Sequence, residues 1–207
     1  MFQSFEESAS SAASANRLEL LRAELAHLGV DGFIVPRADE HQGEYIPDAA
    51  ARLAWLTGFS GSAGYAVVLP DSATLFVDGR YTTQARDQVD PAVMQTASSI
   101  DTPLPKYLSG VAAGMTIGFD PWLHTQAEAA ALRKAAEETG FKLVPLPHNP
   151  IDRIWQDRPL APKGKVVQHP ETLAGRSAAA KLDEMGETMR AAGGTAAVLT
   201  DPSSICL

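Results

Sequence analysis

The feature that most constrains the fold is an internal repeat that starts twice within the chain. Residues 17–35 and 181–199 align without a gap at a constant offset of 164 positions. Apolar side chains meet at the aligned positions, Leu18 with Leu182, Leu21 with Met185, and Leu25 with Met189. Each copy continues with a glycine, Gly29 or Gly193, and four positions later with three apolar residues, 33–35 or 197–199. Each copy therefore predicts an amphipathic helix, a glycine stop and a buried strand.

The distance between the two copies predicts one complete domain followed by the opening of a second. We expect a disordered tail over residues 1–14 and a first domain over 15–147. A proline-rich linker is expected over 148–176, and the truncated start of the second domain over 177–207. Domains of about 150 residues bury enough surface to fold alone, and the first domain is close to that size. Chemistry performed by a longer parent protein is then expected to lie beyond this chain.

Composition indicates a soluble globular protein and argues against several kinds of partner. Hydrophobic residues make up 45% of the chain and charged residues 20%, which is ordinary for a globular domain. The net charge of −8 argues against a nucleic-acid partner, which requires a basic surface. No apolar run approaches the ~20 residues that cross a bilayer, and the N-terminus lacks the basic region of a secretory signal. With Cys206 as its one cysteine, the chain is expected in the cytoplasm.

Periodicity and turn residues predict an alternation of helices and strands. Helices are expected over residues 17–28, 49–57, 81–87, 103–111 and 124–140. Strands are expected over 33–35, 65–69, 73–77, 116–119 and 142–146, with a possible edge strand over 93–97. Asn16 and Thr125 stand at the positions of helix N-caps, and Pro70 to Ser72 predict a hairpin turn. The pattern indicates an α/β domain on a mixed sheet.

The first candidate site is the acidic segment Asp39, Glu40 and His41, with Glu44 and Tyr45 close behind. Carboxylates and an imidazole within a few residues can bind a divalent metal ion. A metal site, however, needs ligands that converge in space, usually from separate elements. The spacing also differs from that of a zinc-hydrolase helix. We therefore favour a loop with internal hydrogen bonds over a metal site.

The second candidate is the glycine- and serine-rich segment 58–64. A nucleophile elbow requires Gly-x-Ser-x-Gly, and neither Ser60 nor Ser62 has that context. A serine hydrolase is therefore the weakest interpretation, because no His or Asp partner is identifiable from spacing. The simpler interpretation is a tight turn in which glycines adopt positive φ, and three glycines also permit close approach of another element.

The third candidate is Arg80, in the turn Asp78-Gly79-Arg80-Tyr81. Its planar guanidinium can clamp a carboxylate of a ligand. It can equally pair with Asp78 or Asp87 in a structural role, and the sequence does not decide between these two interpretations.

Four stretches together resemble the N-terminal part of the three-domain Xaa-Pro aminopeptidases of the creatinase/prolidase group. They are HQGEYI at 41–46, LTGFSGSAG at 56–64, FVDGRY at 76–81 with Gln84 and Ala85, and NPIDRIW at 149–155 with Arg158 and Pro159. The resemblance covers nearly the whole chain after about residue 14. It implies a creatinase N-terminal-like domain, with a mixed sheet and flanking helices, followed by the start of a second copy of the same fold.

The resemblance also implies what the parent protein does. The family consists of metallopeptidases that remove an N-terminal residue preceding proline, using two divalent metal ions of the manganese type. Two Asp, one His and two Glu ligands lie on a C-terminal "pita-bread" domain. None of those positions falls within this chain, so we expect no metal site, no catalytic residue and no peptidase activity of the chain alone.

For the N-terminal part, the resemblance implies a role in homodimer formation and in shaping the substrate channel. The residues expected to line that channel are Tyr45, Arg52, Phe59, Ser60 and Arg80. The expected substrates of the full-length protein are peptides with proline at the second position. The alternative is a stand-alone binding or dimerisation module with a pseudoenzyme fold, and the sequence downstream in the parent gene would separate the two.

Overall fold

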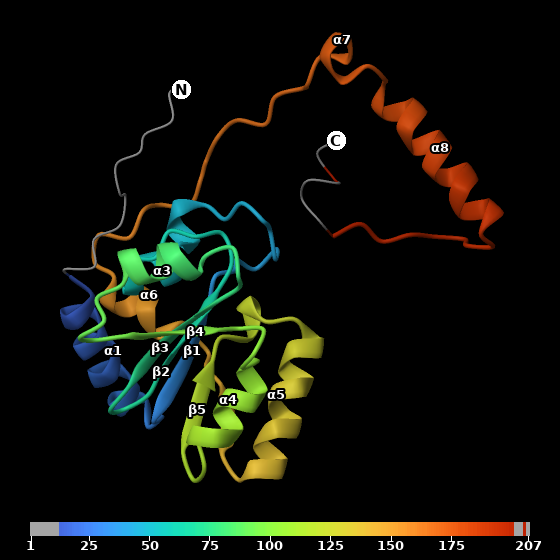
Figure 1. Cartoon of the computed structure of the whole chain (residues 1–207). Helices are drawn as coiled ribbons and strands as arrows, with labels where there is room; N and C mark the ends of the chain where they lie inside the picture. The colour runs from blue at the N-terminus through green and yellow to red at the C-terminus, as the bar shows by residue number, and fades with distance from the viewer. Residues whose placement is uncertain (1–12, 201–204, 206–207) are drawn as a thin grey trace.

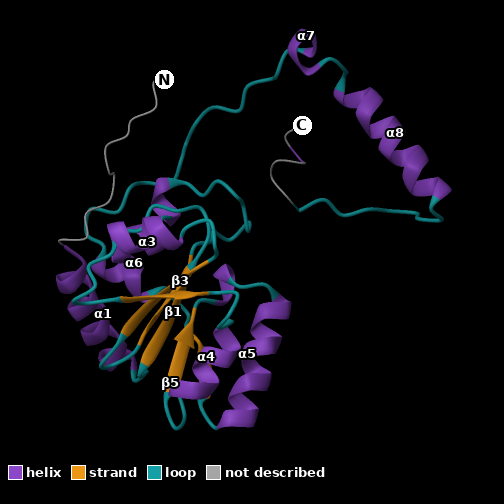
Figure 2. Ribbon diagram, viewed as in Figure 1, coloured by secondary structure: helices purple, strands orange, loops and turns teal. Residues whose placement is uncertain are grey.

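The computed structural model describes residues 13–200 and residue 205. Its body is a six-stranded sheet with helices on both faces (Figures 1 and 2). The strands are β1 (Gly32–Pro36), β2 (Tyr65–Val68), β3 (Ala73–Val77), β4 (Gln95–Ser98), β5 (Thr116–Phe119) and β6 (Lys142–Pro145). The disordered tail predicted over residues 1–14 falls almost entirely on residues 1–12, which lie outside the described residues.

The sheet is mixed, as the alternation of elements predicts. Its strand order is β4-β3-β2-β1-β5-β6, so the predicted edge strand β4 does lie at an edge. β2 runs antiparallel to both β1 and β3, whereas the β1–β5, β5–β6 and β3–β4 pairs are parallel. Every strand except β2 therefore points the same way, and the loops that follow those strands gather at one edge of the sheet. We call this the carboxyl edge.

Helices cover the two faces of the sheet with two separate cores. The helices of the body are α1 (Ser14–Leu28), α2 (Arg52–Thr57), α3 (Thr82–Gln88), α4 (Leu104–Val111), α5 (Gln126–Thr139) and α6 (Pro150–Ile154), with the short turns η2 (Asp48–Ala50) and η3 (Pro121–Leu123). Residues of α1, α2, α3 and α6 pack into one core, and residues of α4 and α5 into the other. Phe33 and Ile34, neighbours on β1, point into opposite cores, as the period of a strand requires.

The ends of α1 show which capping signals the fold uses. Gly29 ends the helix in the left-handed conformation with φ 70°, which confirms the predicted glycine stop. The predicted N-cap Asn16 is wrong, because the helix begins at Ser14 and its N-cap position is Ala13. Ser14 is only 1% exposed, so packing against the body extends the helix past the local capping signal.

Of two further predicted helices, one has the capping signal that the sequence indicates and the other is divided into two elements. Thr125 caps α5 in a capping box, in which its hydroxyl accepts from the Glu128 N–H and the Glu128 carboxylate accepts from the Thr125 N–H. The single helix predicted over 49–57 is instead two elements, η2 and α2, separated at Ala51, whose ψ of 44° is not helical.

The first part of the predicted linker packs on the body. Ile151 is fully buried in the α1 core, and the Trp155 ring stacks on Trp55 at a centroid distance of 5.3 Å. This contact gives Trp155 a packing surface on the body. The predicted domain limits stay predictions, but the packed core of the first domain reaches Trp155.

The second copy of the repeat lies apart from the body in Figure 1. It contains most of α8 (Ala178–Ala191), which has the helical conformation predicted from the repeat, and the short helix α7 (Glu171–Ala174) precedes it. The strand predicted over 197–199 is wrong, because the described residues up to Thr200 form no strand after α8. A strand needs a partner for its backbone hydrogen bonds, and none of the described strands pairs with this segment.

Candidate functional site

The carboxyl edge brings the predicted site residues to one side of the molecule. Tyr45 lies in the loop after β1, and Arg52 begins the helix that follows that loop. Arg80 lies after β3. Phe59 and Ser60 precede β2, which runs in the opposite direction and therefore starts at the same edge. In open α/β sheets this edge is the usual place for ligands.

The acidic segment after β1 is a loop held by its own hydrogen bonds, as the favoured interpretation predicts. The Asp39 carboxylate is buried and accepts from the N–H groups of His41 and Gly43, at 3.1 and 3.0 Å. Arg37 fixes the far end by donating to the Glu44 carbonyl at 2.7 Å. Within residues 13–200 and 205, no group of three or more His, Cys, Asp or Glu side chains could hold a metal ion.

Tyr45 and Arg52 line one cavity of about 650 Å³, together with Arg158 and most of the loop after β1. Tyr45 is 87% exposed, whereas the Arg52 side chain is only 9% exposed. Tyr45 and Arg52 are therefore the two predicted residues that share this cavity. Of these two, only Tyr45 offers a large accessible surface. We call this cavity the arginine cavity.

Arg52 is held by an ion pair that joins α2 to α6. Its Nε and Nη2 donate to the two carboxylate oxygens of Asp152 at 2.6 and 2.9 Å. Arg158 approaches the same carboxylate at 2.7 Å through Nη1 and donates from Nε to the Ala49 carbonyl at 2.7 Å. Two guanidinium groups thus share one carboxylate, and they tie the segment after α6 to the loop that carries η2.

Phe59 lies in the core rather than on a surface. It is 1% exposed and meets Tyr81 edge-on at a centroid distance of 5.7 Å. Gly61 is required by this packing, because a Cβ atom there would stand 2.1 Å from the Phe59 ring. Gly58 has φ 80° and Gly64 has φ 153°, so the predicted tight turn with positive φ is confirmed.

The hydroxyl groups of Ser60 and Ser62 are bonded to amide and phenol groups. Ser60 Oγ accepts from the side-chain amides of Gln84 and Gln88 at 3.1 and 2.9 Å. Ser62 Oγ lies 2.5 Å from the Tyr81 hydroxyl, and this hydrogen bond lowers the pKa of Tyr81. Among the described residues, neither serine bonds to an imidazole, as a serine nucleophile would.

Arg80 adopts the structural pairing that the sequence left open. Its Nε and Nη2 donate to the carboxylate of Asp78 at 3.1 and 2.7 Å, and its guanidinium lies 5.2 Å from the centre of the Tyr81 ring. The hydrogen bond from Arg80 lowers the pKa of Asp78, and the same bond raises the pKa of Arg80. The Arg80 side chain is 66% exposed, so this positive group still faces solvent at the carboxyl edge.

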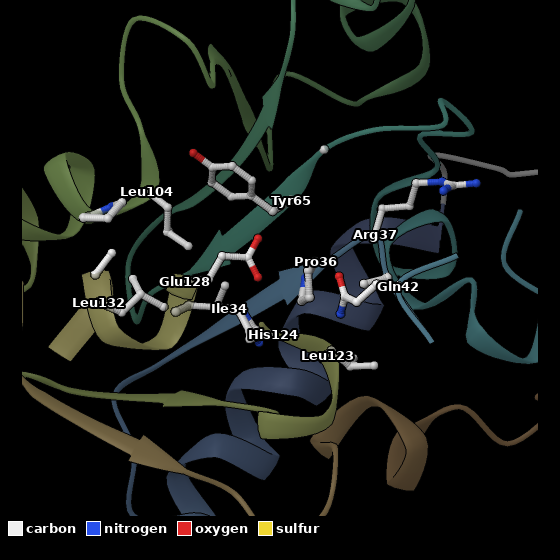
Figure 3. A pocket seen from close by; sticks show the side chains of 14 residues that line it. Ile34, Pro36, Arg37, Gln42, Tyr65, Leu104, Leu123, His124, Glu128 and Leu132 are labelled. Atoms are coloured by element: carbon white, nitrogen blue, oxygen red, sulfur yellow. The ribbon is translucent and has the colours of Figure 1, made fainter. Parts of the chain in front are cut away.

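A second cavity at the same edge was missed by the sequence interpretation. It has a volume of about 320 Å³ and is lined by residues from the end of β1, the start of β2, α4 and the segment that leads into α5 (Figure 3). Among its lining residues are Arg37, Gln42, Tyr65, His124 and Glu128. Burial raises the pKa of Tyr65 to about 12. No sequence signal points to this cavity, because its walls come from segments that only the strand order brings together.

Comparisons with known proteins agree on one family. The family model of the creatinase/prolidase N-terminal domain matches residues 17–154. A curated relative from Coccidioides posadasii (strain RMSCC 757 / Silveira), named as a probable Xaa-Pro aminopeptidase P, is 37% identical over 177 residues. A relative of the same name from Aspergillus oryzae is 36% identical over 176 residues. Each alignment covers 83% of this chain, but only 29% and 27% of the relatives, so the chain spans less than a third of their length.

Two solved structures are similar in fold and sequence. An X-prolyl aminopeptidase from Caenorhabditis elegans, described as a cytosolic enzyme with a di-nuclear active site, matches with a TM-score of 0.75 and 29% identity, over 87% of this chain and 32% of that chain. The N-terminal domain of the cytoplasmic peptidase PepQ from Mycobacterium tuberculosis matches with a TM-score of 0.53 and 29% identity, over 67% of this chain and 98% of that one.

In the part of the chain that the structure describes, none of the helices combines the length and the apolar character needed to span a membrane.

Proposed function

This chain belongs to the creatinase/prolidase N-terminal domain family, and from that premise we propose that it is the non-catalytic N-terminal region of an Xaa-Pro aminopeptidase. The parent enzyme would remove an N-terminal residue that precedes proline. The observation that carries this proposal is the alignment with curated Xaa-Pro aminopeptidase P relatives over 83% of the chain. A cytoplasmic location belongs to the same proposal, because the Caenorhabditis elegans enzyme is described as cytosolic.

The residues of this chain do not fit a dinuclear metal centre. Such a centre needs several carboxylate and imidazole ligands in one place, and the described residues contain no such group. In the acidic segment that includes His41, the Asp39 carboxylate accepts hydrogen bonds from the backbone of its own loop. We therefore assign the two divalent metal ions, proposed to be manganese, and the cleavage step to the remainder of the parent protein.

The contribution of this region is proposed to be the carboxyl edge, as a surface for homodimer formation and for one wall of the substrate channel. Three large apolar side chains stand exposed there, each on a loop that follows a different strand: Tyr45 at 87%, Ile100 at 70% and Trp122 at 75%. Exposed apolar groups of this size mark interaction surfaces when they gather on one side of a protein. Arg80 adds an exposed positive group at the same edge.

The alternative, a stand-alone binding or dimerisation module, is favoured by one observation. The body closes two cores of its own, and the similar PepQ structure is of an N-terminal domain alone. Under this alternative the isolated chain would dimerise without any further sequence. Sedimentation of the chain and of the full-length parent separates the two proposals, because the main proposal expects the parent to carry additional dimer contacts.

The test of the main proposal is an assay of an Xaa-Pro peptide with Mn²⁺ present, using the 207-residue chain beside the full-length parent. We expect cleavage by the parent only. Metal-dependent cleavage by the short chain, persisting after a check for contaminants, would overturn the assignment of catalysis to the remainder of the parent.

The channel role is tested in the full-length parent with Arg80→Ala and Tyr45→Ala. Both should raise KM or weaken the dimer, because both side chains are exposed at the carboxyl edge. The matched control is Lys142→Ala, an exposed charge at the opposite edge where β6 begins. Unchanged KM and unchanged assembly in both variants would remove support for this role.

A further inference from the structure

The two edges of the sheet differ in their protection against pairing with another strand. β4 and β6 are the edge strands, and in the view of Figure 1 β4 runs across the front of the sheet below α3. An edge strand exposes unpaired backbone groups, and charged side chains or a proline usually protect it. β6 begins with Lys142 and ends with Pro145. β4 has the sequence Gln-Thr-Ala-Ser, which contains neither a charge nor a proline, so this edge can accept a further strand.

The hydrogen bonds of β4 show which of its backbone groups face away from the sheet. The Ser99 N–H, directly after the strand, donates to the Val77 carbonyl of β3 at 2.9 Å. Alternate residues of a strand direct their backbone groups to opposite sides, so Ala97 also bonds towards β3. Thr96 and Ser98 therefore direct their N–H and C=O groups towards the open side of the sheet.

One of these outward groups already has a partner within the chain. The Ser98 carbonyl accepts from the Thr102 N–H at 3.1 Å, in the turn that follows the strand. A carbonyl oxygen has two lone pairs, so the Ser98 carbonyl can accept a second hydrogen bond. Both outward residues can therefore donate and accept along the open edge.

A cavity beside β4 makes this edge accessible. It has a volume of about 420 Å³, and its walls include Thr82 and Arg86 of α3. Thr96, Ala97 and Ser98 all line it, although successive side chains of a strand point to opposite faces. A cavity that touches three consecutive residues of one strand reaches the edge of that strand. The same three residues are only half-buried, so a partner can approach their backbone.

A second copy of the chain fits this edge in an antiparallel register centred on Ala97. In that register Thr96 lies opposite Ser98 of the partner subunit, and the two residues exchange both N–H···O=C hydrogen bonds. A two-fold axis generates the same pair again, so four backbone hydrogen bonds join the copies. Continuing the register places Asp101 opposite Val93 of the partner subunit. Within residues 93–101, therefore, no like charges oppose each other.

We propose that two copies of this chain pair through β4 and join their sheets into one continuous sheet of twelve strands. Main-chain hydrogen bonds at an open sheet edge are a recurring way for protein segments to associate. Ile100 is 70% exposed and lines the same cavity, so it supplies an apolar side chain at each end of the paired strands. The pairing gives the homodimer of the proposed function, on which it rests, a defined interface next to the carboxyl edge.

Sedimentation equilibrium of the 207-residue chain between about 5 and 500 µM tests the pairing. We expect a reversible monomer–dimer equilibrium. The amide protons of Thr96 and Ser98 should exchange more slowly at the higher concentration, because they donate across the edge only in the dimer. The full-length parent should dimerise more tightly than the chain, because the main proposal expects additional contacts there.

A pair of charge variants tests the register. Thr96→Lys and Thr96→Glu each place like charges near the two-fold axis, so each variant alone should weaken the dimer at least about tenfold. An equimolar mixture of the two variants should recover dimerisation, because opposite charges then meet across the axis. The thermal transition of each variant checks that it folds.

Two controls separate this edge from other surfaces of the chain. Lys142→Glu reverses a charge on the protected edge strand β6, and Met185→Lys adds a charge to an exposed apolar position of α8. Neither control should change the dissociation constant of the dimer by more than about twofold.

Three results would overturn the proposal. One is a chain that stays monomeric up to about 500 µM. Another is a dimer that is unchanged in folded Thr96→Lys, or that does not recover in the mixture of charge variants. The last is loss of the dimer in Met185→Lys, which would assign the contact to α8. Each of these outcomes leaves the peptidase assay untouched, so failure here is distinguishable from failure of the proposed function.

Discussion

Helices α1 and α8 carry the same apolar pattern, but they end in opposite environments. Leu18 and Leu21 of α1 are 1% and 0% exposed, whereas the aligned Leu182 and Met185 of α8 are 63% and 45% exposed. Both segments are helical, and a left-handed glycine follows each, Gly29 with φ 70° and Gly193 with φ 77°. The comparison separates two steps that usually occur together, because the pattern specifies the helix and the sheet beneath it provides the burial.

The body shows what α8 lacks. α1 packs on β1 and against α2 and α6, so its apolar stripe joins a large core. No strand lies beside residues 195–200 in the described chain. A helix of about 14 residues is marginal in water without tertiary packing. Gly186 in the middle of α8 lowers its helix propensity further, by about 1 kcal/mol relative to alanine.

The largest expected difference is in hydrogen exchange. Amides of α1 should exchange only with global unfolding, which for a domain means a free energy of about 5–15 kcal/mol. Amides of α8 should open with a free energy near zero, because none of the residues of α8 is buried. Exchange followed by mass spectrometry or NMR measures both. Equal protection of the two helices would show that α8 docks in solution and would break the comparison.

Truncation of two aligned apolar side chains should give the next largest difference in the free energy of unfolding. Leu21→Ala should lower the free energy of unfolding by about 2–5 kcal/mol, because it leaves a cavity in the α1 core. Met185→Ala at the aligned position should change it by less than about 0.5 kcal/mol. Urea unfolding of the two variants, followed by tryptophan fluorescence, provides the measurement. A large loss for Met185→Ala would contradict the exposed state of α8.

Ion pairs offer a third contrast between the two regions. Arg52→Ala should cost about 2 kcal/mol, because it leaves the partly buried Asp152 with one of its two guanidinium partners. Arg176→Ala removes an exposed pair with Glu184, at side-chain exposures of 53% and 60%, and should cost almost nothing. Arg52→Lys tests the two-point contact of the guanidinium with Asp152, because lysine keeps the positive charge but loses one of the two parallel hydrogen bonds. Equal unfolding midpoints for all three variants would refute this contrast.

Helix caps should give the smallest difference. Thr125→Ala removes the capping box of α5 and should destabilise the body by about 1 kcal/mol. Ser177→Ala removes the N-cap of α8, where the hydroxyl accepts from the Ala180 N–H. It should lower helical content in circular dichroism without shifting the unfolding midpoint of the body. A shift of that midpoint would indicate that α8 and the body unfold together.

Much of the fold could be predicted from the sequence because its signals are local. The hairpin of β2 and β3, the Thr125 cap and the Gly29 stop depend on residues within a few positions of one another. The N-cap at Asn16 failed because Ser14 is buried by residues far away in the chain. The predicted strand over 197–199 failed for the complementary reason, since a strand requires a neighbour that local sequence does not specify.

The candidate site was less predictable, since its geometry depends on distant pairs. Tyr45 and Arg80 do stand exposed at the carboxyl edge, whereas Phe59 packs in the core. Asp152 and Arg158 belong to a stretch that the family resemblance already included. Their pairing with Arg52, however, spans 100 positions in the chain and has no signature in spacing.

The sequence by itself determined the type of each main element, the duplicated pattern of α1 and α8, and the membership of a family whose motifs are short and contiguous. Only the tertiary structure decided which copy of the pattern is buried, how the strands are ordered, and that His124 and Arg37 line one cavity. The physical reason is that propensity, capping and turns act over a few residues. Burial and the convergence of charges depend on which strands become neighbours.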